Sequence, residues 1–236
     1  MLLAFVVTLA ALAILIGLGT WQLQRLAEKE EIIAKLNERL SAPPIALPPR
    51  EAWQRMERER DEFRRVTFPA EFLHEQEALV YSTGSALRPD VSGPGYWVFT
   101  PARLLGGSVI VVNRGFVPEA RRDPASRAEG QVRGVVDVVG ALRWPEPRRS
   151  FTPADKPDQN QWFVRDHLGM AEAKGWGSVA PFAVELEGPL PPGGLPKPGK
   201  LQAKLPNNHL NYAITWYGLA GALLLVFGFW MRQGLR

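Results

Sequence analysis

His209 is the side chain in this sequence that is best suited to cofactor chemistry. It stands between a Pro- and Gly-rich stretch and an uncharged apolar run, where a neutral imidazole can ligate iron at a membrane surface. On a helix, four later residues share its side: Tyr212, Ala213, Trp216 and Tyr217. Such a surface suits a flat porphyrin, and Arg25 on an N-terminal helix can meet a propionate. The alternative is an interfacial histidine bonded to water or lipid headgroups, and the residues alone leave both interpretations open.

The segment Asn113-Arg114-Gly115-Phe116-Val117-Pro118 is the second candidate. A strand that ends in a Gly turn, closed by Pro118, accounts for these residue types without any function. The functional alternative is a partner surface formed by Asn113, Arg114 and Gly115. Spacing alone does not separate the two.

Most catalytic and metal-binding templates are absent from the 236 residues. The chain has no cysteine, which excludes disulfides and thiolate sites, and its three histidines are too scattered to suggest a metal cluster. It has no G-x-S-x-G, H-E-x-x-H or P-loop motif. Asp166-His167 suggests a hydrolase, but no activated serine completes the pair. We therefore expect a protein that is not an enzyme.

The net charge of +4 does not indicate nucleic-acid binding. A nucleic-acid interface needs a clustered basic face, whereas here charges alternate in sign, as in Glu57-Arg58-Glu59-Arg60-Asp61. Such a pattern is typical of a solvated surface.

Two uncharged apolar stretches, residues 2–18 and 210–231, lie near the ends of the chain. As helices they reach about 26 and 33 Å, enough to span a hydrocarbon core of about 30 Å. The first is either a retained anchor or a signal peptide. The lack of a basic leader and of an Ala-x-Ala site favours the anchor, with Trp21 at the interface. Its helix is predicted to continue to about Leu40, before Pro43-Pro44.

The second stretch begins where Asn207 or Asn208 can cap a helix, and aromatic residues stand near both of its ends. Orientation is ambiguous, because most flanking basic residues lie on the side of the central domain. These are Arg25, Lys29, Lys197, Lys200 and Lys204, against Arg232 and Arg236 beyond the spans. Long loops cross membranes largely regardless of charge, so the count alone leaves both orientations open.

The middle of the chain reads as short strands separated by Gly and Pro clusters such as Ser92-Gly93-Pro94-Gly95 and Gly106-Gly107. The predicted strands are 64–72, 78–82, 96–100, 108–113, 132–142 and 183–186, with a helix around 165–174. This spacing favours an antiparallel sheet curled into a small barrel or sandwich. The fold class is thus an α+β membrane protein with two transmembrane helices flanking an antiparallel, barrel-like β domain. The predicted divisions are helix 1–23, helical extension 24–45, β-rich domain 46–187, Pro/Gly-rich linker 188–208 and helix 209–231.

Several blocks of the sequence resemble the Surfeit locus protein 1 (Shy-type) family, and the resemblance covers residues 14 to 230. Its two most specific blocks are Val111-Val112-Asn113-Arg114-Gly115-Phe116-Val117-Pro118 and Asn207-Asn-His-Leu-Asn-Tyr-Ala-Ile-Thr-Trp-Tyr217. The supporting blocks are Gly17-Leu-Gly-Thr-Trp-Gln-Leu-Gln-Arg-Leu, Phe63-Arg64-Arg65-Val66, Gly95-Tyr96-Trp97-Val98-Phe99-Thr100-Pro101, Gly140-Ala-Leu-Arg143 and Asn160-Gln161-Trp162.

The resemblance implies a cytochrome c oxidase assembly factor that helps to place haem a into subunit I. Its partners would be that subunit, the haem a synthesis and delivery machinery, and membrane lipid. In bacterial members a histidine just before the second span is implicated in haem binding, and His209 is the matching position. The predicted cofactor-binding set is His209, the iron ligand, with Tyr212, Trp216, Trp21 and Arg25.

The resemblance also favours an orientation with both termini cytoplasmic and the central domain periplasmic. The chain shows no basic N-terminal tail and no mitochondrial transit peptide, so we expect a bacterial plasma (inner) membrane. Two other functions stay open: a tethered scaffold for the nascent oxidase subunit with no cofactor of its own, and a membrane-anchored hydrolase, which lacks a nucleophile–base pair.

Overall fold

The computed structural model describes residues 2–203 and 207–234. The chain divides into two compact units: residues 1–35 with 205–236, and residues 36–204. The predicted fold class is confirmed, because apolar helices at the two ends of the sequence bracket a sheet domain that contains a β-barrel. Lys204 and Arg236 of the charge count, and residues 204–206 of the predicted linker, lie outside the described residues.

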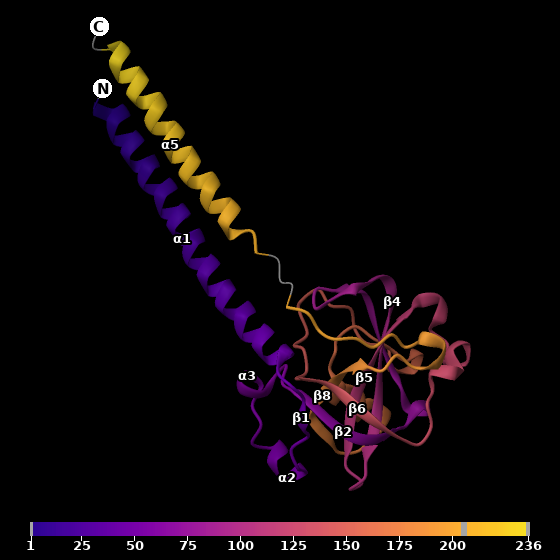
Figure 1. Ribbon diagram of the computed structural model, residues 1–236. Coiled ribbons are helices and arrows are strands. Elements are labelled where there is room, and N and C mark those ends of the chain that lie inside the picture. Colours follow the sequence, from indigo (N-terminus) through magenta and orange to yellow (C-terminus); the bar gives the residue numbers. More distant parts are fainter. Residues whose placement is uncertain (1, 204–206, 235–236) are drawn as a thin grey trace. The chain divides into compact units, whose positions relative to one another are not determined.

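The two terminal helices are α1 (Leu2–Ser41) and α5 (His209–Gly234) (Figure 1). Both are long and apolar enough to cross a membrane, and only 6% of each apolar stretch is buried. A core helix of a soluble protein would instead be mostly buried. Helix α1 ends at Ser41, just before Pro43 and Pro44, because proline cannot continue a helix.

Within their unit, α1 and α5 run antiparallel. The rings of Phe5 and Phe227, near the two chain ends, have centroids 6.2 Å apart. Further along, the Oγ1 atom of Thr20 lies 3.0 Å from the Oη atom of Tyr217. Gly19 permits this approach, since a Cβ there would lie 2.9 Å from the Tyr217 ring.

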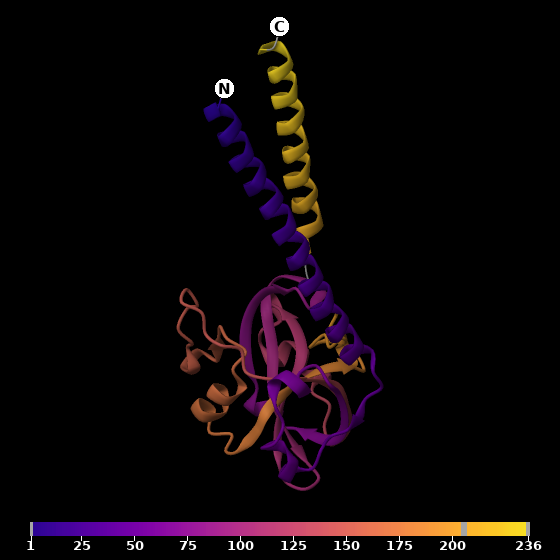
Figure 2. The same ribbon diagram turned by 90° about the vertical axis from the view of Figure 1, so that its left-hand side faces the viewer.

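The domain between them is built on one eight-stranded sheet (Figure 2). Its strands are β1 (Ile45–Ala46), β2 (Arg65–Phe72), β3 (Ala78–Ser85), β4 (Arg88–Leu104), β5 (Val109–Pro118), β6 (Val135–Arg143), β7 (Gln161–Trp162) and β8 (Val179–Gly188). Its helices are α2 (Arg50–Trp53), α3 (Arg58–Asp61) and α4 (His167–Lys174), with short 3-10 turns η1 (His74–Gln76), η2 (Glu119–Arg121), η3 (Pro124–Gly130), η4 (Pro157–Gln159) and η5 (Pro192–Gly194).

The sheet closes because β4 is long enough to pair on several sides. Strand order is β1-β2-β6-β8-β5-β4-β3-β7, and the end of β4 returns to β2, with Phe72 opposite Ala102. Each predicted strand overlaps an observed one, but Ser92-Gly93-Pro94-Gly95, predicted as a separator, lies inside β4. The pairing is also not wholly antiparallel, because β5 and β8 run parallel.

Alternating residues of the strands fill the barrel. Val66, Phe68 and Ala70 of β2 are buried on one face of the strand, where they pack with residues such as Ile110 and Phe182. A second apolar cluster, around Trp97 and Met170, lies under helix α4. This packing covers both faces of β5, so nearly every residue of that strand is buried.

The stretch after β8 was predicted to be a linker, but most of its described part packs on the domain. Phe116 and Lys197 exchange both backbone hydrogen bonds, at 3.0 and 2.8 Å, and the Gly199 amide donates to the Leu186 carbonyl at 3.0 Å. Leu201 is buried. The described part of this Pro- and Gly-rich stretch contains no α-helix, and it includes the 3-10 turn η5.

Candidate functional site

His209 is the first residue of α5, and its imidazole is held by a side chain of the other terminal helix. The His209 Nδ1 atom lies 2.7 Å from the Oε1 atom of Gln22. An amide oxygen only accepts hydrogen bonds, so in the neutral imidazole this contact requires the proton on Nδ1 and leaves the Nε2 lone pair free. Histidines that bind metals commonly have this arrangement, in which the second ring nitrogen donates to a fixed acceptor.

The predicted cap of this helix is only partly observed. The Tyr212 amide donates to the backbone carbonyl of Asn208 at 3.2 Å, which continues the helical pattern back to that residue. The Asn207 Oδ1 atom is buried and finds no hydrogen-bond partner in the described parts of the chain. Side-chain capping by Asn207 is therefore not seen.

The aromatic residues predicted to accompany His209 differ in exposure. Tyr212 is 56% exposed, whereas Trp216 is half-buried and its indole Nε1 has no hydrogen-bond partner among residues 2–203 and 207–234. Tyr217 turns toward α1, where it meets Gly19 and Thr20. The start of α5 thus offers an imidazole nitrogen and an exposed phenol, beside a buried indole N–H.

Trp21 and Arg25 form a local pair on α1. The Arg25 guanidinium lies 5.8 Å from the Trp21 ring centroid, and its Nη1 atom is 2.7 Å from Glu28 Oε2. Both partners of the Arg25–Glu28 pair are about half exposed. Exposed ion pairs of this kind are weak, so Arg25 is available to another anion at small cost.

The structure argues against the partner-surface alternative for the Asn113-Arg114-Gly115 segment. These residues lie inside β5, where Asn113 is 1% and Arg114 4% exposed. Asn113 donates from Nδ2 to Glu185 Oε2 at 2.7 Å, and its own Oδ1 accepts from the Gly115 amide at 3.1 Å. A partner surface needs exposed side chains, so these two serve the interior of the domain instead.

Gly115 is required by the segment that crosses it. Its φ is +123°, and a Cβ there would lie 2.1 Å from the Lys197 carbonyl oxygen. Only glycine combines this backbone conformation with such close contact. The motif thus fixes the packed segment after β8 to strand β5.

Arg114 belongs to a buried cluster of charges centred on Glu77. Its Nη2 donates to the Gly130 carbonyl, and its Nη1 lies 4.0 Å from Glu77 Oε2. Arg127 holds the same carboxylate with both of its terminal nitrogens. Burial lowers the pKa of Arg114 to about 10, which still leaves the guanidinium charged at neutral pH.

Asp166-His167, the remaining catalytic candidate, has a structural role. The Asp166 carboxylate caps α4 by accepting from the Leu168 and Gly169 amides at 3.2 Å each. His167 is buried and bonds the Ala180 carbonyl through Nε2 at 3.2 Å, and burial lowers its pKa to about 4. No group of three or more potential metal-binding side chains occurs among the described residues.

Comparison with known proteins fixes the family. The sequence profile of the SURF1 family matches residues 9–221. The chain belongs to the SURF1 family. It is 40% identical to the SURF1-like protein of Monosiga brevicollis over 228 residues, which cover 92% of this chain and 84% of that protein. It is 36% identical to Surfeit locus protein 1 of Rattus norvegicus, covering 93% and 72% of the two chains, and 34% identical to that of Homo sapiens, covering 93% and 74%.

The two most specific blocks of this SURF1-family chain lie in different units. Asn113-Arg114-Gly115 is part of the β domain, whereas His209 and its aromatic neighbours begin α5. Sequence reasoning missed Gln22, the acceptor that orients His209, and Glu77, the carboxylate that two arginines share. A polar residue beside an apolar span was the available signal for Gln22, since such residues are often functional.

Proposed function

We propose that this SURF1-family chain is an assembly factor for cytochrome c oxidase and not an enzyme. The family assignment supports the first part. The structural role of Asp166-His167 removes the one hydrolase candidate that the sequence offered. The proposed partners are oxidase subunit I and the machinery that makes and delivers haem a.

We further propose that the chain holds haem a transiently, with His209 as the iron ligand. The observation that carries this proposal is the Nδ1 contact with Gln22, which leaves the Nε2 lone pair for a metal. When bound, the haem supplies an iron that accepts an imidazole nitrogen. The residues at this end of α5 fit such a group, because Tyr212 is exposed and the Trp216 N–H has no partner in the described chain.

Trp21 and Arg25 are proposed to contribute from α1. Arg25 is a suitable partner for a propionate, because its ion pair with Glu28 is exposed and easily exchanged. A delivery factor must also release its haem. A site with a single imidazole ligand and few other contacts around the haem suits that release.

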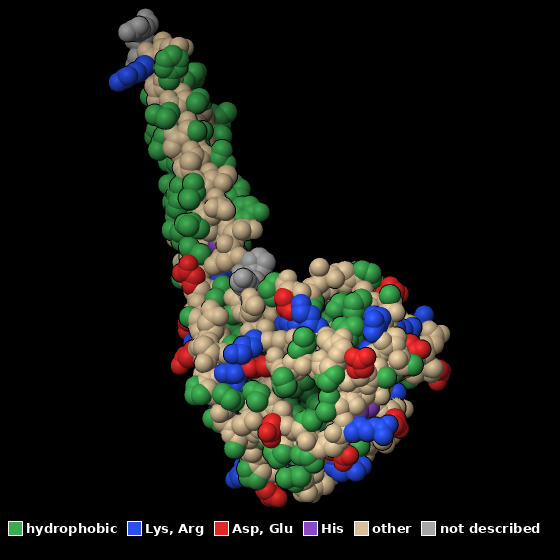
Figure 3. All heavy atoms as spheres, turned by 45° about the vertical axis from the view of Figure 1, so that its right-hand side comes forward, with side chains coloured by type: hydrophobic (Ala, Val, Ile, Leu, Met, Phe, Trp, Pro, Cys, Tyr) green, Lys and Arg blue, Asp and Glu red, His purple; other side chains and the backbone are tan. Residues whose placement is uncertain are grey.

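The proposed setting is a bacterial inner membrane that α1 and α5 cross in opposite directions. Hydrophobic side chains are frequent along the visible face of these helices, and most of the visible Lys, Arg, Asp and Glu lie on the β domain (Figure 3). Two crossings place both ends of the chain on one face and the β domain on the other. We propose that the domain is periplasmic.

The test is to purify the full chain from a host that makes haem a and to record its absorption spectrum. We expect bound haem a in the unmodified protein, its loss in His209→Ala, and affinity at least about tenfold lower in Gln22→Leu. Gln24→Leu, an exposed amide two positions along α1, is the matched control and should bind normally.

Two results would contradict the haem role. One is unchanged haem content in His209→Ala. The other is purification with oxidase subunit I and no haem spectrum in any preparation, which would favour the scaffold function.

A further inference from the structure

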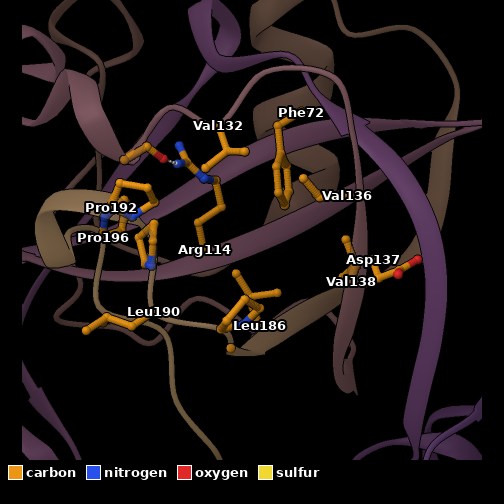
Figure 4. Close-up of a pocket in the computed structure, with 14 residues that line it drawn as sticks. Phe72, Arg114, Val132, Val136, Asp137, Val138, Leu186, Leu190, Pro192 and Pro196 are labelled. Carbon is orange, nitrogen blue, oxygen red and sulfur yellow. Dashed lines mark hydrogen bonds between the residues drawn. The ribbon is translucent and has the colours of Figure 1, made fainter.

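The β domain contains a pocket that is separate from His209 and lies within one unit of the chain. It lies between β5, β6, the end of β8 and the packed segment that follows, and it has a volume of about 140 Å³ (Figure 4). A cavity of about 150 Å³ holds a benzene molecule. The pocket is therefore large enough for an apolar group of about six non-hydrogen atoms.

The walls of this pocket are almost entirely apolar. They include Phe72, Val132, Val136, Leu186 and Leu190. Leu190, at the mouth, is 61% exposed. Asp137 also contributes to the lining, but its carboxylate points away from the pocket (Figure 4). Arg114 is thus the charged side chain that faces the interior.

The charge of Arg114 is incompletely balanced by the protein. Arg114 and Arg127 share the single carboxylate of Glu77, and Arg127 takes both of its oxygens. The Arg114 Nη1 atom is buried and makes no hydrogen bond with any residue in the described ranges. The nearby His74 adds no negative charge, and burial with the two arginines lowers its pKa.

A buried, unneutralised cation is costly, and an anion supplied from outside relieves that cost. The guanidinium fork matches a carboxylate in shape and charge. The surrounding walls cannot hold a highly charged or strongly hydrated ion, because they offer few polar groups. The complementary ligand therefore joins one carboxylate to a short apolar body.

We propose that this pocket binds a small apolar monocarboxylate, with its carboxylate at Arg114 and its hydrocarbon part among Phe72, Val136 and Leu186. The site is independent of His209 and of haem. It gives the buried Arg114 a ligand-binding role in addition to its bond with Gly130.

Hexanoate is the appropriate probe, with hexanol and hexylamine as analogues of the same length. The full chain in lipid nanodiscs is titrated with each compound and followed by calorimetry, with empty nanodiscs as the reference. Hexanoate should bind at least about tenfold more tightly than hexanol, because only the acid forms a charge-assisted contact. Hexylamine should not bind.

Three variants locate the site. Val136→Phe fills the pocket and leaves Arg114 and Glu77 in place, and it should abolish hexanoate binding. Arg114→Lys keeps the charge but loses the fork, and should weaken binding. Asp137→Asn, at an exposed carboxylate that points away, should leave the affinity unchanged.

The thermal unfolding midpoint of each variant shows whether the domain remains folded. If Arg114→Lys unfolds, the Val136→Phe result and the ratio of the hexanoate and hexanol affinities still test the proposal. Equal binding of acid and alcohol, normal binding by folded Val136→Phe, or no hexanoate binding to the unmodified chain would each overturn the proposal. Haem binding at His209 is unaffected by any of these outcomes.

Discussion

The β domain and the pair of terminal helices use polar side chains in opposite ways. In the domain, charged groups such as Glu77 and Arg127 are buried and tied to one another. In the helix pair, apolar side chains such as Leu3 and Leu225 face outward. The polar contacts that join those helices, such as Gln22 to His209 and Thr20 to Tyr217, are isolated ones.

This difference indicates which interactions stabilise each unit. The domain has a closed sheet and a packed core, so its own interactions specify its fold. The described parts of the two helices carry little buried surface, which is consistent with lipid around their apolar faces. A polar contact between such helices has more influence on local orientation than on stability.

The largest expected effect lies in the domain's buried charges. Glu77→Gln leaves Arg114 and Arg127 without a carboxylate, and we expect the free energy of unfolding to fall by about 3–5 kcal/mol. Urea unfolding followed by tryptophan fluorescence measures this change. Glu31→Gln, which removes an exposed pair with Lys35, should cause no measurable change. A loss below about 1 kcal/mol in Glu77→Gln would show that the cluster is not central to the fold.

Acidification should also weaken the domain through His167. Its pKa is lowered from 6.5 to about 4 by burial, so below pH 6.5 the unfolded chain binds a proton that the folded chain does not. Stability is therefore complete above pH 6.5 and falls by up to about 3 kcal/mol as the pH approaches 4. Unfolding measurements at pH 7 and 4.5 test this dependence, and His167→Gln should reduce it. The pKa of His74 shifts in the same direction, so a smaller slope should remain. An unchanged slope in the variant would refute the assignment.

The next largest loss of stability is expected at Gly115, which we compare with Gly107 because both glycines have a positive φ. Gly115→Ala combines an unfavourable φ with a clash against the Lys197 carbonyl, and should cost more than about 2 kcal/mol. Gly107→Ala has a φ of +80° but open space around it, and should cost about 1 kcal/mol. The unfolding midpoints of the two variants distinguish the cost of backbone strain, which both variants share, from the cost of the steric clash, which only Gly115→Ala has. Equal midpoints would mean that the packed segment after β8 does not hold β5.

The smallest effect is expected between the helices. Tyr217→Phe removes the contact with Thr20, which is worth about 0.6 kcal/mol if it is an average interhelical hydrogen bond.

The proximity of the two helices can be measured by disulfide cross-linking. The chain has no cysteine, so a disulfide between Phe5→Cys and Phe227→Cys reports that proximity. Cross-linking in nanodiscs should change little in Tyr217→Phe. Complete loss of cross-linking would mean that this one contact holds the pair together.

Local features of both units could be predicted from the sequence, whereas features that depend on long-range packing could not. The helix ends and the strand positions were predictable, because apolar runs, alternation and proline act locally. The burial of Arg114 was not, because a charged residue in a strand usually marks a surface, and here both faces of β5 are covered. The Gln22 contact depends on the relative register of two helices that lie at opposite ends of the sequence, which no local pattern specifies.

The most direct test of the proposed function is the haem a content of oxidase subunit I in cells. A bacterial host that lacks its own family member is supplied with the unmodified chain, His209→Ala or Gln24→Leu, and haem a per purified subunit I is measured. We expect full haem content with the unmodified chain and with Gln24→Leu, and a marked deficit with His209→Ala at equal protein levels. Full haem content with His209→Ala would show that His209 does not act in haem delivery.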